Sequence, residues 1–309
     1  MAAAMVKKLR SDKRRTVGAF AAYTHSQPGL YAHMFVQDIE NGLMGFRHLR
    51  DAEERRVEVE GDEAGEAALD SICTALSDYP GYDLGDTVQR AIESIARRLA
   101  WFGKAIYEIC GSGAEISLVS VTPHRLFRVP GGFIQLVTKS DRQWVDGRRY
   151  SFLPASCAWV VRLPRRLGGP RGHRRLLDQL TAVSQPAPEF WTRDLQAGRL
   201  ATEFMVADYN RNRDAYIARI TRRWGWNRRD SSGAHSTEFF YFFRSLRFRQ
   251  SQAILRNHIV DEMNKFLAHR GVNARVRLKG FHSPAELRDL IRRVLAGSAH
   301  YAEALGDAR

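Results

Sequence analysis

Seven arginines are interleaved with two tyrosines and two tryptophans in residues 209–229, which read YNRNRDAYIARITRRWGWNRR. Guanidinium groups bind phosphates and aromatic rings stack on bases, so this pattern indicates a surface that contacts nucleic acid. Arginine also stacks on aromatic rings within subunit interfaces, and that alternative stays open. The candidate residues for contact with DNA or with a neighbouring subunit are Arg211, Arg213, Arg219, Arg222, Arg223, Trp224, Trp226, Arg228 and Arg229.

Motifs of known catalytic sites are absent from the sequence. It has no dinucleotide-binding glycine fingerprint, no P-loop lysine motif, no zinc-protease histidine pair and no nucleophile elbow. The glycine pairs in 130–133 and 167–170 are interpreted as tight turns, because neither is completed by a lysine or serine at a helix start. His124 and His258 lack metal-ligand spacing and are interpreted as structural. We therefore expect no enzymatic activity, no metal and no cofactor.

The net charge of the chain is strongly positive, because 48 Lys and Arg outnumber 34 Asp and Glu to give +14. This balance favours a polyanionic partner, although an arginine-rich source proteome would produce it too. The three cysteines are far apart, so neither a zinc knuckle nor a disulfide framework is indicated, and a reducing intracellular environment fits. No apolar run of about 18 residues occurs, so we expect no transmembrane helix and no membrane partner.

Hydrophobic periodicity shows which elements must position these side chains. Apolar residues recur at helical spacing up to Phe102, with Asp86 as the expected N-cap and Gly103 as the left-handed residue that ends the helix. Short strands then follow in 104–163. The stretch RRLAWFGKAIYE is thus a helix-to-strand junction, in which Trp101 and Phe102 pack beneath the turn at Gly103.

Three further segments between residues 51 and 198 carry local signals. Residues 51–70 hold nine acidic side chains, which we expect to be solvated or to face arginines elsewhere in the assembly. Asp146-Gly147 predicts a hairpin between RQWV and RRYSFL. The segment 163–175, with five arginines, is expected to be a loop, and helical structure with a break at QPAPE is expected over 174–198.

The C-terminal part predicts a long helix over 237–269 with Gly271 after its end. Its aromatic start, FFYFFRSLRF, should be buried against other elements or other subunits. A strand over 274–279 and a short helix from Ser283 to Gly297 should follow, with Pro284 at the first helical position. The candidates for oligomer packing are Phe239, Phe240, Phe242, Phe243 and Phe248.

Taken in order, these segments resemble those of a tailed-phage portal protein in a compact form. RRLAWFGKAIYEI is similar to that family's helix leading into an aromatic–glycine step and a strand, and VTPHRLFRV and GGFIQLV to its proline-led β segment. SCAWVVRLPRRLGGPRG is similar to the strand that runs into a glycine-rich turn. FFYFFRSLRFRQSQAILRNHIVDEMNKFL resembles the family's long C-terminal helix with its late asparagine, here Asn264. The chain is short for a portal, and it is basic where portal channels are often acidic.

The resemblance implies an α+β fold in which long helices flank a small strand-rich unit, with portal-like wing and stem architecture. The expected divisions are a basic N-terminal arm (1–27), a helix plus strand-rich wing-like domain (28–170), a stem- or clip-like region (171–236), the long helix with its strand and short helix (237–297), and a tail (298–309). It also implies a homo-oligomeric ring, a dodecamer in the family, at a capsid vertex. Double-stranded DNA would pass through this ring.

The partners that the resemblance implies are further copies of the chain, double-stranded DNA, and capsid, terminase and tail-connector proteins. The location implied is a virion or phage-like particle assembled in the bacterial cytoplasm. Two other hypotheses stay open. One is a basic DNA-binding accessory protein that uses the Arg/Trp segment. The other is a nucleic-acid enzyme, for which the fold would have to bring together carboxylates such as Glu108, Glu115, Asp141 and Asp146.

Overall fold

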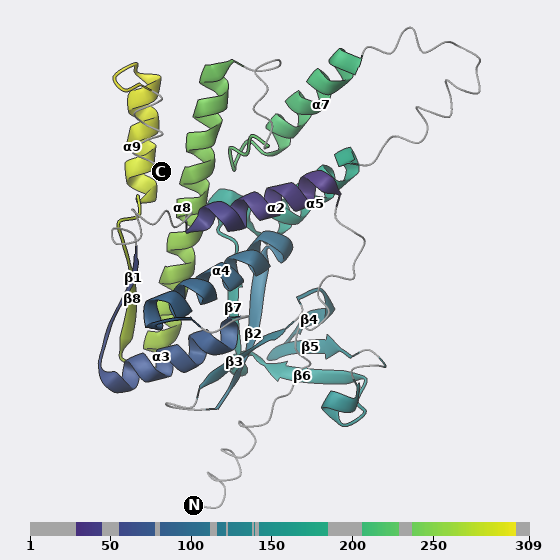
Figure 1. The fold of residues 1–309 in the computed structure, drawn as a ribbon. Coiled ribbons are helices and arrows are strands. Elements are labelled where there is room, and N and C mark those ends of the chain that lie inside the picture. The colour runs from purple at the N-terminus through teal and green to yellow at the C-terminus, as the bar shows by residue number, and fades with distance from the viewer. Residues whose placement is uncertain are drawn as a thin grey trace, which may run out of the picture. The chain divides into compact units, whose positions relative to one another are not determined.

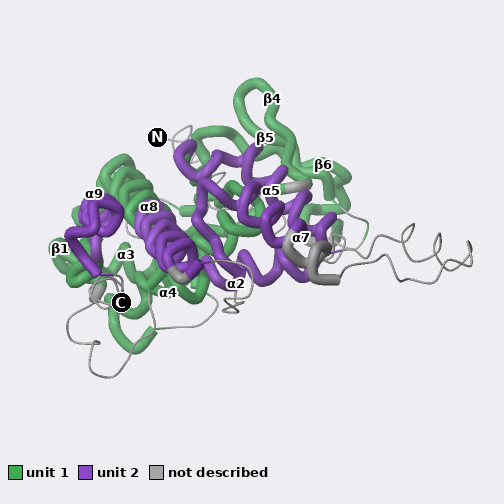
Figure 2. Tube along the Cα trace, turned by 90° about the horizontal axis from the view of Figure 1, so that it is seen from above, with its two compact units in different colours: residues 1–24, 40–164, 255–281 green, residues 25–39, 165–254, 282–309 purple. Residues whose placement is uncertain are grey.

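The computed structural model describes residues 29–44, 56–77, 81–111, 116–121, 123–137, 139, 142–184, 206–228 and 237–300. These residues form two compact units (Figure 2). Unit 1 takes the described residues between 40 and 164 and between 255 and 281, and unit 2 takes the others. Both units therefore draw on separate stretches of chain, whereas the sequence favoured successive domains. The fold class is α+β, as expected.

Unit 1 contains two antiparallel three-stranded sheets. The first has the order β3-β2-β7 and the second β4-β5-β6. Ile106 and Val121 of the first sheet form one core cluster with Leu126 and Leu153 of the second, so the two sheets pack face to face. The strands are β2 (Lys104–Cys110), β3 (Ser117–Val121), β4 (Leu126–Val129), β5 (Gly132–Leu136), β6 (Tyr150–Pro154) and β7 (Ala158–Arg162), with short 3-10 turns at Pro123–Arg125, Arg142–Val145 and Ala155–Cys157.

Helices cover the other face of the first sheet. Helix α3 (Glu63–Leu76) packs against β3, and α4 (Leu84–Phe102) packs against β2 (Figure 1). The second half of α8 (Glu238–Arg270) belongs to the same unit, where Phe266 stacks on Trp159 with 4.7 Å between ring centroids. Trp159 in turn lies 5.3 Å from Tyr107, its cross-strand partner on β2. Unit 1 is thus layered as helices, sheet and second sheet.

The expected helix-to-strand junction is confirmed. Helix α4 ends at Phe102 and β2 begins at Lys104. Between them Gly103 has φ 67°, and its N–H donates to the carbonyl of Leu99 at 2.8 Å. A glycine suits this left-handed position because it has no Cβ to clash. Trp101 and Phe102 are half-buried beside it.

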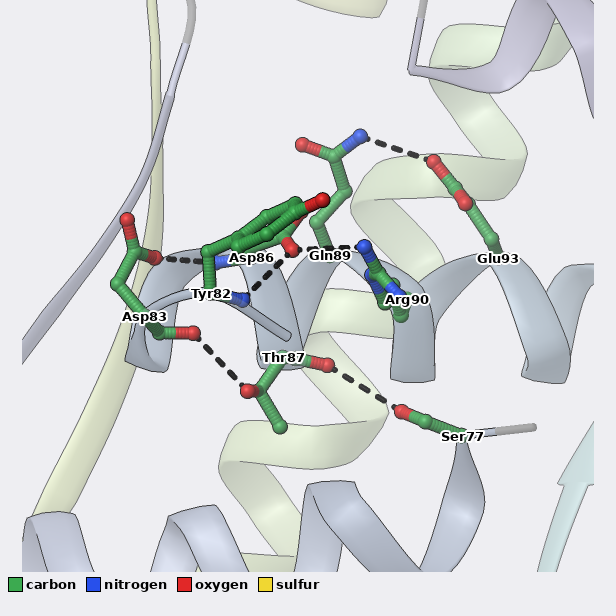
Figure 3. A network of polar contacts seen from close by, with 8 residues as sticks. All are labelled: Ser77, Tyr82, Asp83, Asp86, Thr87, Gln89, Arg90 and Glu93. Atoms are coloured by element: carbon green, nitrogen blue, oxygen red, sulfur yellow. Dashed lines mark hydrogen bonds and ion pairs between the residues drawn. The ribbon is translucent and has the colours of Figure 1, made fainter. Parts of the chain in front are cut away.

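The start of α4 is capped by Asp83, and the expectation that Asp86 is the cap was wrong. The Asp83 carboxylate accepts the backbone N–H of Asp86 at 2.7 Å. Asp86 instead accepts the N–H of Tyr82 at 3.0 Å and pairs with Arg90 at 3.0 Å (Figure 3). Asp83 is the cap because it has the extended backbone that this position requires, whereas Asp86 lies within the first turn of the helix.

The acidic segment faces cations of its own chain. Residues Arg56–Gly61 form strand β1, which pairs antiparallel with β8 (Ala274–Lys279). Across this ladder Glu58 lies 3.3 Å from Lys279, and Glu60 lies 2.9 Å from Arg277. These two glutamates thus face cations of the same chain, and the Glu60 side chain also keeps 50% of its surface exposed. Strand β8 was predicted, but β1 and α3 were not.

The predicted hairpin at Asp146-Gly147 is only partly correct. Both residues have positive φ, 53° and 75°, as a tight turn requires. However, Arg142–Val145 is a 3-10 turn rather than a strand, and β6 pairs with β5 instead. The tight turn predicted in 130–133 is confirmed, because Val129 and Gly132 face each other across the β4-β5 hairpin.

Unit 2 consists of helices: the first part of α2 (Leu30–Leu43), α5 (Gly169–Ser184), α7 (Val206–Ile220), the first half of α8 and α9 (Pro284–Leu295), with a 3-10 turn at Arg165–Leu167. Helix α5 begins inside the segment 163–175 that was expected to be a loop. Pro170 is tolerated there because the first backbone N–H groups of a helix have no intrahelical partner.

The predicted C-terminal elements are confirmed. Helix α8 is followed by Gly271 at φ 71°, and the N–H of Val272 donates to the carbonyl of Leu267 at 3.0 Å. This is the six-residue closure that commonly ends helices. Ser283 caps α9 through Glu286 in a reciprocal capping box. The predictions for 1–27, 185–198, 229–236 and 301–309 lie outside the described residues.

Candidate nucleic-acid interface

The two tryptophans of the Arg/Trp segment are buried. Trp224 and Trp226 each expose 1% of their surface, on the turn that follows α7. The ring of Phe35 from α2 lies 5.3 Å from both of them, edge-on, and Trp226 Nε1 donates to Asp38 at 2.8 Å. Their expected stacking on bases is therefore excluded in this conformation, and they form the core beneath the turn.

The turn is pressed closely onto α8. Gly225 has φ 78°, and a Cβ placed there would lie 2.4 Å from the Cβ of Arg247. Arg244, only 5% exposed, donates to the carbonyls of Ala218 and Trp226 and to the hydroxyl of Thr221. Burial, together with the charge of Arg247, lowers the pKa of Arg244 from 12.5 to about 10. The guanidinium is still charged at neutral pH, and its hydrogen bonds hold the end of α7 and the turn together.

Two of the predicted arginines form ion pairs within unit 2. Arg228 pairs with Asp214, a carboxylate whose side chain is 14% exposed. Arg213 lies 3.4 Å from the same carboxylate, and its guanidinium sits 5.7 Å from the ring of Tyr31. Because both guanidinium groups share the Asp214 carboxylate, which offsets one of their two positive charges, these side chains are poorer candidates for phosphate contact than arginines without an acidic neighbour.

Eight arginines of unit 2 are exposed around the end of α7 with its turn and around the neighbouring start of α5, and we call them the arginine surface. The two parts adjoin, since the Arg223 guanidinium lies 3.6 Å from where a Cβ of Gly168 would be. Within the described part of the chain, no carboxylate pairs with any of the eight. They are Arg165, Arg166, Arg171, Arg174, Arg175, Arg219, Arg222 and Arg223.

Five members of the arginine surface were missed as site residues. The sequence did show five arginines in 163–175. The segment was expected to be a loop, however, and a loop does not indicate which side chains face solvent together. As a helix, α5 turns His173 and Leu176 inward and Arg171, Arg174 and Arg175 outward. The structure thus brings together three predicted arginines and five others. The side chains of Arg211 and Arg229 lie outside the described residues.

The aromatic residues at the start of α8 differ in how far they are buried. Phe239 and Phe240 expose 49% and 39% of their surface, so other elements of the chain do not bury them, and burial against other subunits stays a prediction. Phe243 packs on a cluster with Leu246 and Ile291, and Phe248 lies 6.5 Å from Phe35. Phe242 is half-buried. Phe239 and Phe240 are therefore the most accessible of the five residues proposed for oligomer packing.

Of the four acids considered for a nuclease, the two that the structure describes have opposite environments. Glu108 is 1% exposed on β2, whereas the Asp146 side chain is 91% exposed, and Glu115 and Asp141 lie outside the described residues. No group of three metal-ligating side chains occurs within the described ranges. The carboxylates of Asp83 and Asp86 are occupied at the start of α4 (Figure 3). His258 bonds the carbonyl of Arg162 at 2.8 Å, in keeping with a structural role.

Comparisons with models of protein families, with curated proteins and with solved structures each found no match. In the part of the chain that the structure describes, none of the helices combines the length and the apolar character needed to cross a bilayer.

Proposed function

We propose that this chain is a portal-like structural subunit that forms a homo-oligomeric ring and passes double-stranded DNA without making or breaking bonds itself. The arginine surface carries the proposal. It presents eight exposed guanidinium groups that no described carboxylate neutralises, and they are held on helix ends and a tightly packed turn. Such a surface contacts phosphates at any sequence, as a DNA conduit requires.

The order of elements supports the ring. Helix α4, the glycine step and strand β2 follow the pattern that resembles the portal family, as do α8, β8 and α9 at the other end of the chain. The accessible Phe239 and Phe240 offer apolar surface for contact between copies. In this role the ring would sit at a capsid vertex and dock terminase and tail-connector proteins, with no metal or cofactor.

Two measurements test this function. Light scattering of the purified protein at moderate salt should give the mass of a ring of many copies. Binding to double-stranded DNA should weaken with salt, and the variant Arg219→Gln/Arg222→Gln/Arg223→Gln should lower the slope of log affinity against log salt by about 0.9 for each phosphate that the variant no longer neutralises. The matched control is Arg275→Gln/Arg288→Gln/Arg293→Gln, which removes the same charge from exposed arginines elsewhere.

The outcomes separate the portal hypothesis from its alternative. A ring with a salt slope that only the first variant lowers agrees with the proposal. A single chain whose DNA binding depends on the same three arginines would instead favour a DNA-binding accessory protein. Equal effects of the two variants would show that the overall net charge, rather than the arginine surface, attracts DNA, and would contradict the proposed contact.

A further inference from the structure

The second sheet of unit 1 has an outer face made of apolar side chains. Register pairs Phe127 with Ile134 and Ile134 with Phe152, and Leu136 with Tyr150, so these five side chains share one face. Leu126 and Leu153 lie on the opposite face, in the core between the sheets. We call the first set the outer sheet face.

The outer sheet face is exposed to an unusual degree. Phe127, Leu136, Tyr150 and Phe152 expose 51%, 41%, 61% and 49% of their surface. With roughly 200 Å² for a whole aromatic side chain, the patch offers on the order of 400 Å² of apolar area. This is about half of the ~800 Å² that each partner contributes to a standard protein interface, so residues around the face must supply the rest.

The surroundings of the outer sheet face are basic. Lys139, Arg148 and Arg149 are exposed on the connection between β5 and β6. Arg128, on the edge strand β4, is also exposed, but it pairs with Phe133 and so lies on the opposite face of the sheet. Asp146 lies among them, 3.9 Å from Arg148, and offsets one of these charges. A protein partner that fits this region must combine acidic residues with a surface that allows close approach.

Helix α3 combines acidic residues with small exposed side chains. Its sequence, EAGEAALDSICTAL, contains no basic residue, and Asp62 caps it. Glu63 and Asp70 are exposed, and no described cation pairs with either of them. The rest of the exposed side carries small residues, namely Ala64, Ala67, Ser71, Thr74 and Ala75. At about 1.5 Å per residue the helix is ~21 Å long, close to the ~17 Å of a five-residue strand.

We propose that the outer sheet face of one copy binds the exposed side of α3 in a second copy of this chain. The two surfaces differ, so the contact is head-to-tail and repeats from copy to copy, closing into a ring when the rotation allows. This contact rests on the proposed function and would supply its subunit interface. The apolar side chains would bury against the small residues of α3, and the basic surroundings would face Glu63 and Asp70.

Complementation between two variants tests the contact. Phe127→Thr/Phe152→Thr removes aromatic area from the sheet face, and Glu63→Lys/Asp70→Lys reverses two charges on α3. By light scattering, either variant alone should have the mass of one chain. Because each keeps one intact surface, an equimolar mixture should give twice that mass and no more. Thermal unfolding and circular dichroism check that both variants fold.

Matched controls leave both surfaces intact. Leu30→Thr/Leu295→Thr removes exposed apolar side chains elsewhere, and Asp261→Lys/Asp289→Lys reverses exposed acidic charges elsewhere. Both should assemble like the unaltered protein. If the sheet and helix variants also do so, the inferred contact is wrong while the proposed ring stands.

Other outcomes separate the contact from the ring. If the unaltered protein forms pairs or open chains that the two variants abolish, the contact stands and the ring is wrong. If it stays at the mass of one chain at every concentration, both are wrong. Sedimentation with vesicles of anionic phosphatidylglycerol and phosphatidylcholine tests a membrane instead. Vesicle binding that disappears only in Phe127→Thr/Phe152→Thr, with assembly unchanged, would overturn the inference in favour of a lipid surface.

Discussion

The turn after α7 and the outer sheet face hold similar residues in opposite orientations. In the turn, Trp224 and Trp226 are 1% exposed while Arg222 and Arg223 are exposed. On the sheet, Phe127 and Phe152 are about half exposed, while Gln135 and Ser151 on the inner face are only 3% and 7% exposed. Aromatic residues therefore support the surface in one region and form it in the other.

Backbone geometry decides the difference. In the turn, the positive φ of Gly225 folds the chain so that the rings on either side of it both reach Phe35. In a strand, alternate side chains point to opposite faces, and the inner face is already filled by Leu126 and Leu153. The remaining rings of the sheet have no partner in the described part of unit 1 that buries them fully. Composition alone thus gives no reliable guide to which aromatic residues contact a partner.

The largest expected effect is that of Trp226→Ala. Truncating a buried tryptophan leaves a cavity and here also removes the 2.8 Å hydrogen bond to Asp38, so the free energy of unfolding should fall by about 3–5 kcal/mol. Urea unfolding followed by circular dichroism measures this. A decrease below about 1 kcal/mol would show that the ring is not part of the core and would reopen its role in stacking on bases.

The next effect compares two glycines with similar backbone. Gly225→Ala places a Cβ at φ 78° and 2.4 Å from the Cβ of Arg247, whereas Gly147→Ala meets nothing within 4 Å at φ 75°. Both substitutions cost about 1–2 kcal/mol for the left-handed conformation. Only Gly225→Ala must also displace α8, so its unfolding free energy should fall further by about 1–3 kcal/mol. Equal decreases in urea titrations would show that the turn is not pressed onto the helix.

Local signals in the sequence were sufficient for much of the fold. The helix ends at Gly103, Gly271 and the Ser283–Glu286 capping box were predictable, because each of these signals involves residues only a few positions apart in the sequence. The pairing of β1 with β8 depends on residues more than two hundred positions apart, and no local pattern specifies it. The N-cap of α4 was assigned to the wrong aspartate, because Asp83, three residues before Asp86, has the same kind of capping side chain.

The candidate site was harder to predict than the fold. The excess of arginines in 209–229 indicated a basic region, but which side chains reach solvent depends on tertiary packing. Asp214 pairs with Arg228, and Phe35 from another helix covers both tryptophans. The outer sheet face was not predicted. Its register depends on the pairing of β5 with β6, whereas the sequence indicated that β6 pairs with the RQWV segment between them.

The smallest expected effect tests the sheet side of the comparison. Phe152→Thr keeps a residue that favours strands, and the ring is already 49% exposed, so the free energy of unfolding should change by about 1 kcal/mol or less. Its neighbour Leu153 is fully buried on the other face, and Leu153→Ala should cost about 2–5 kcal/mol. Urea unfolding of both variants at low protein concentration measures the difference. A Phe152→Thr effect as large as that of Leu153→Ala would place the ring inside a core, and the sheet would then have no outer apolar face to offer a second copy.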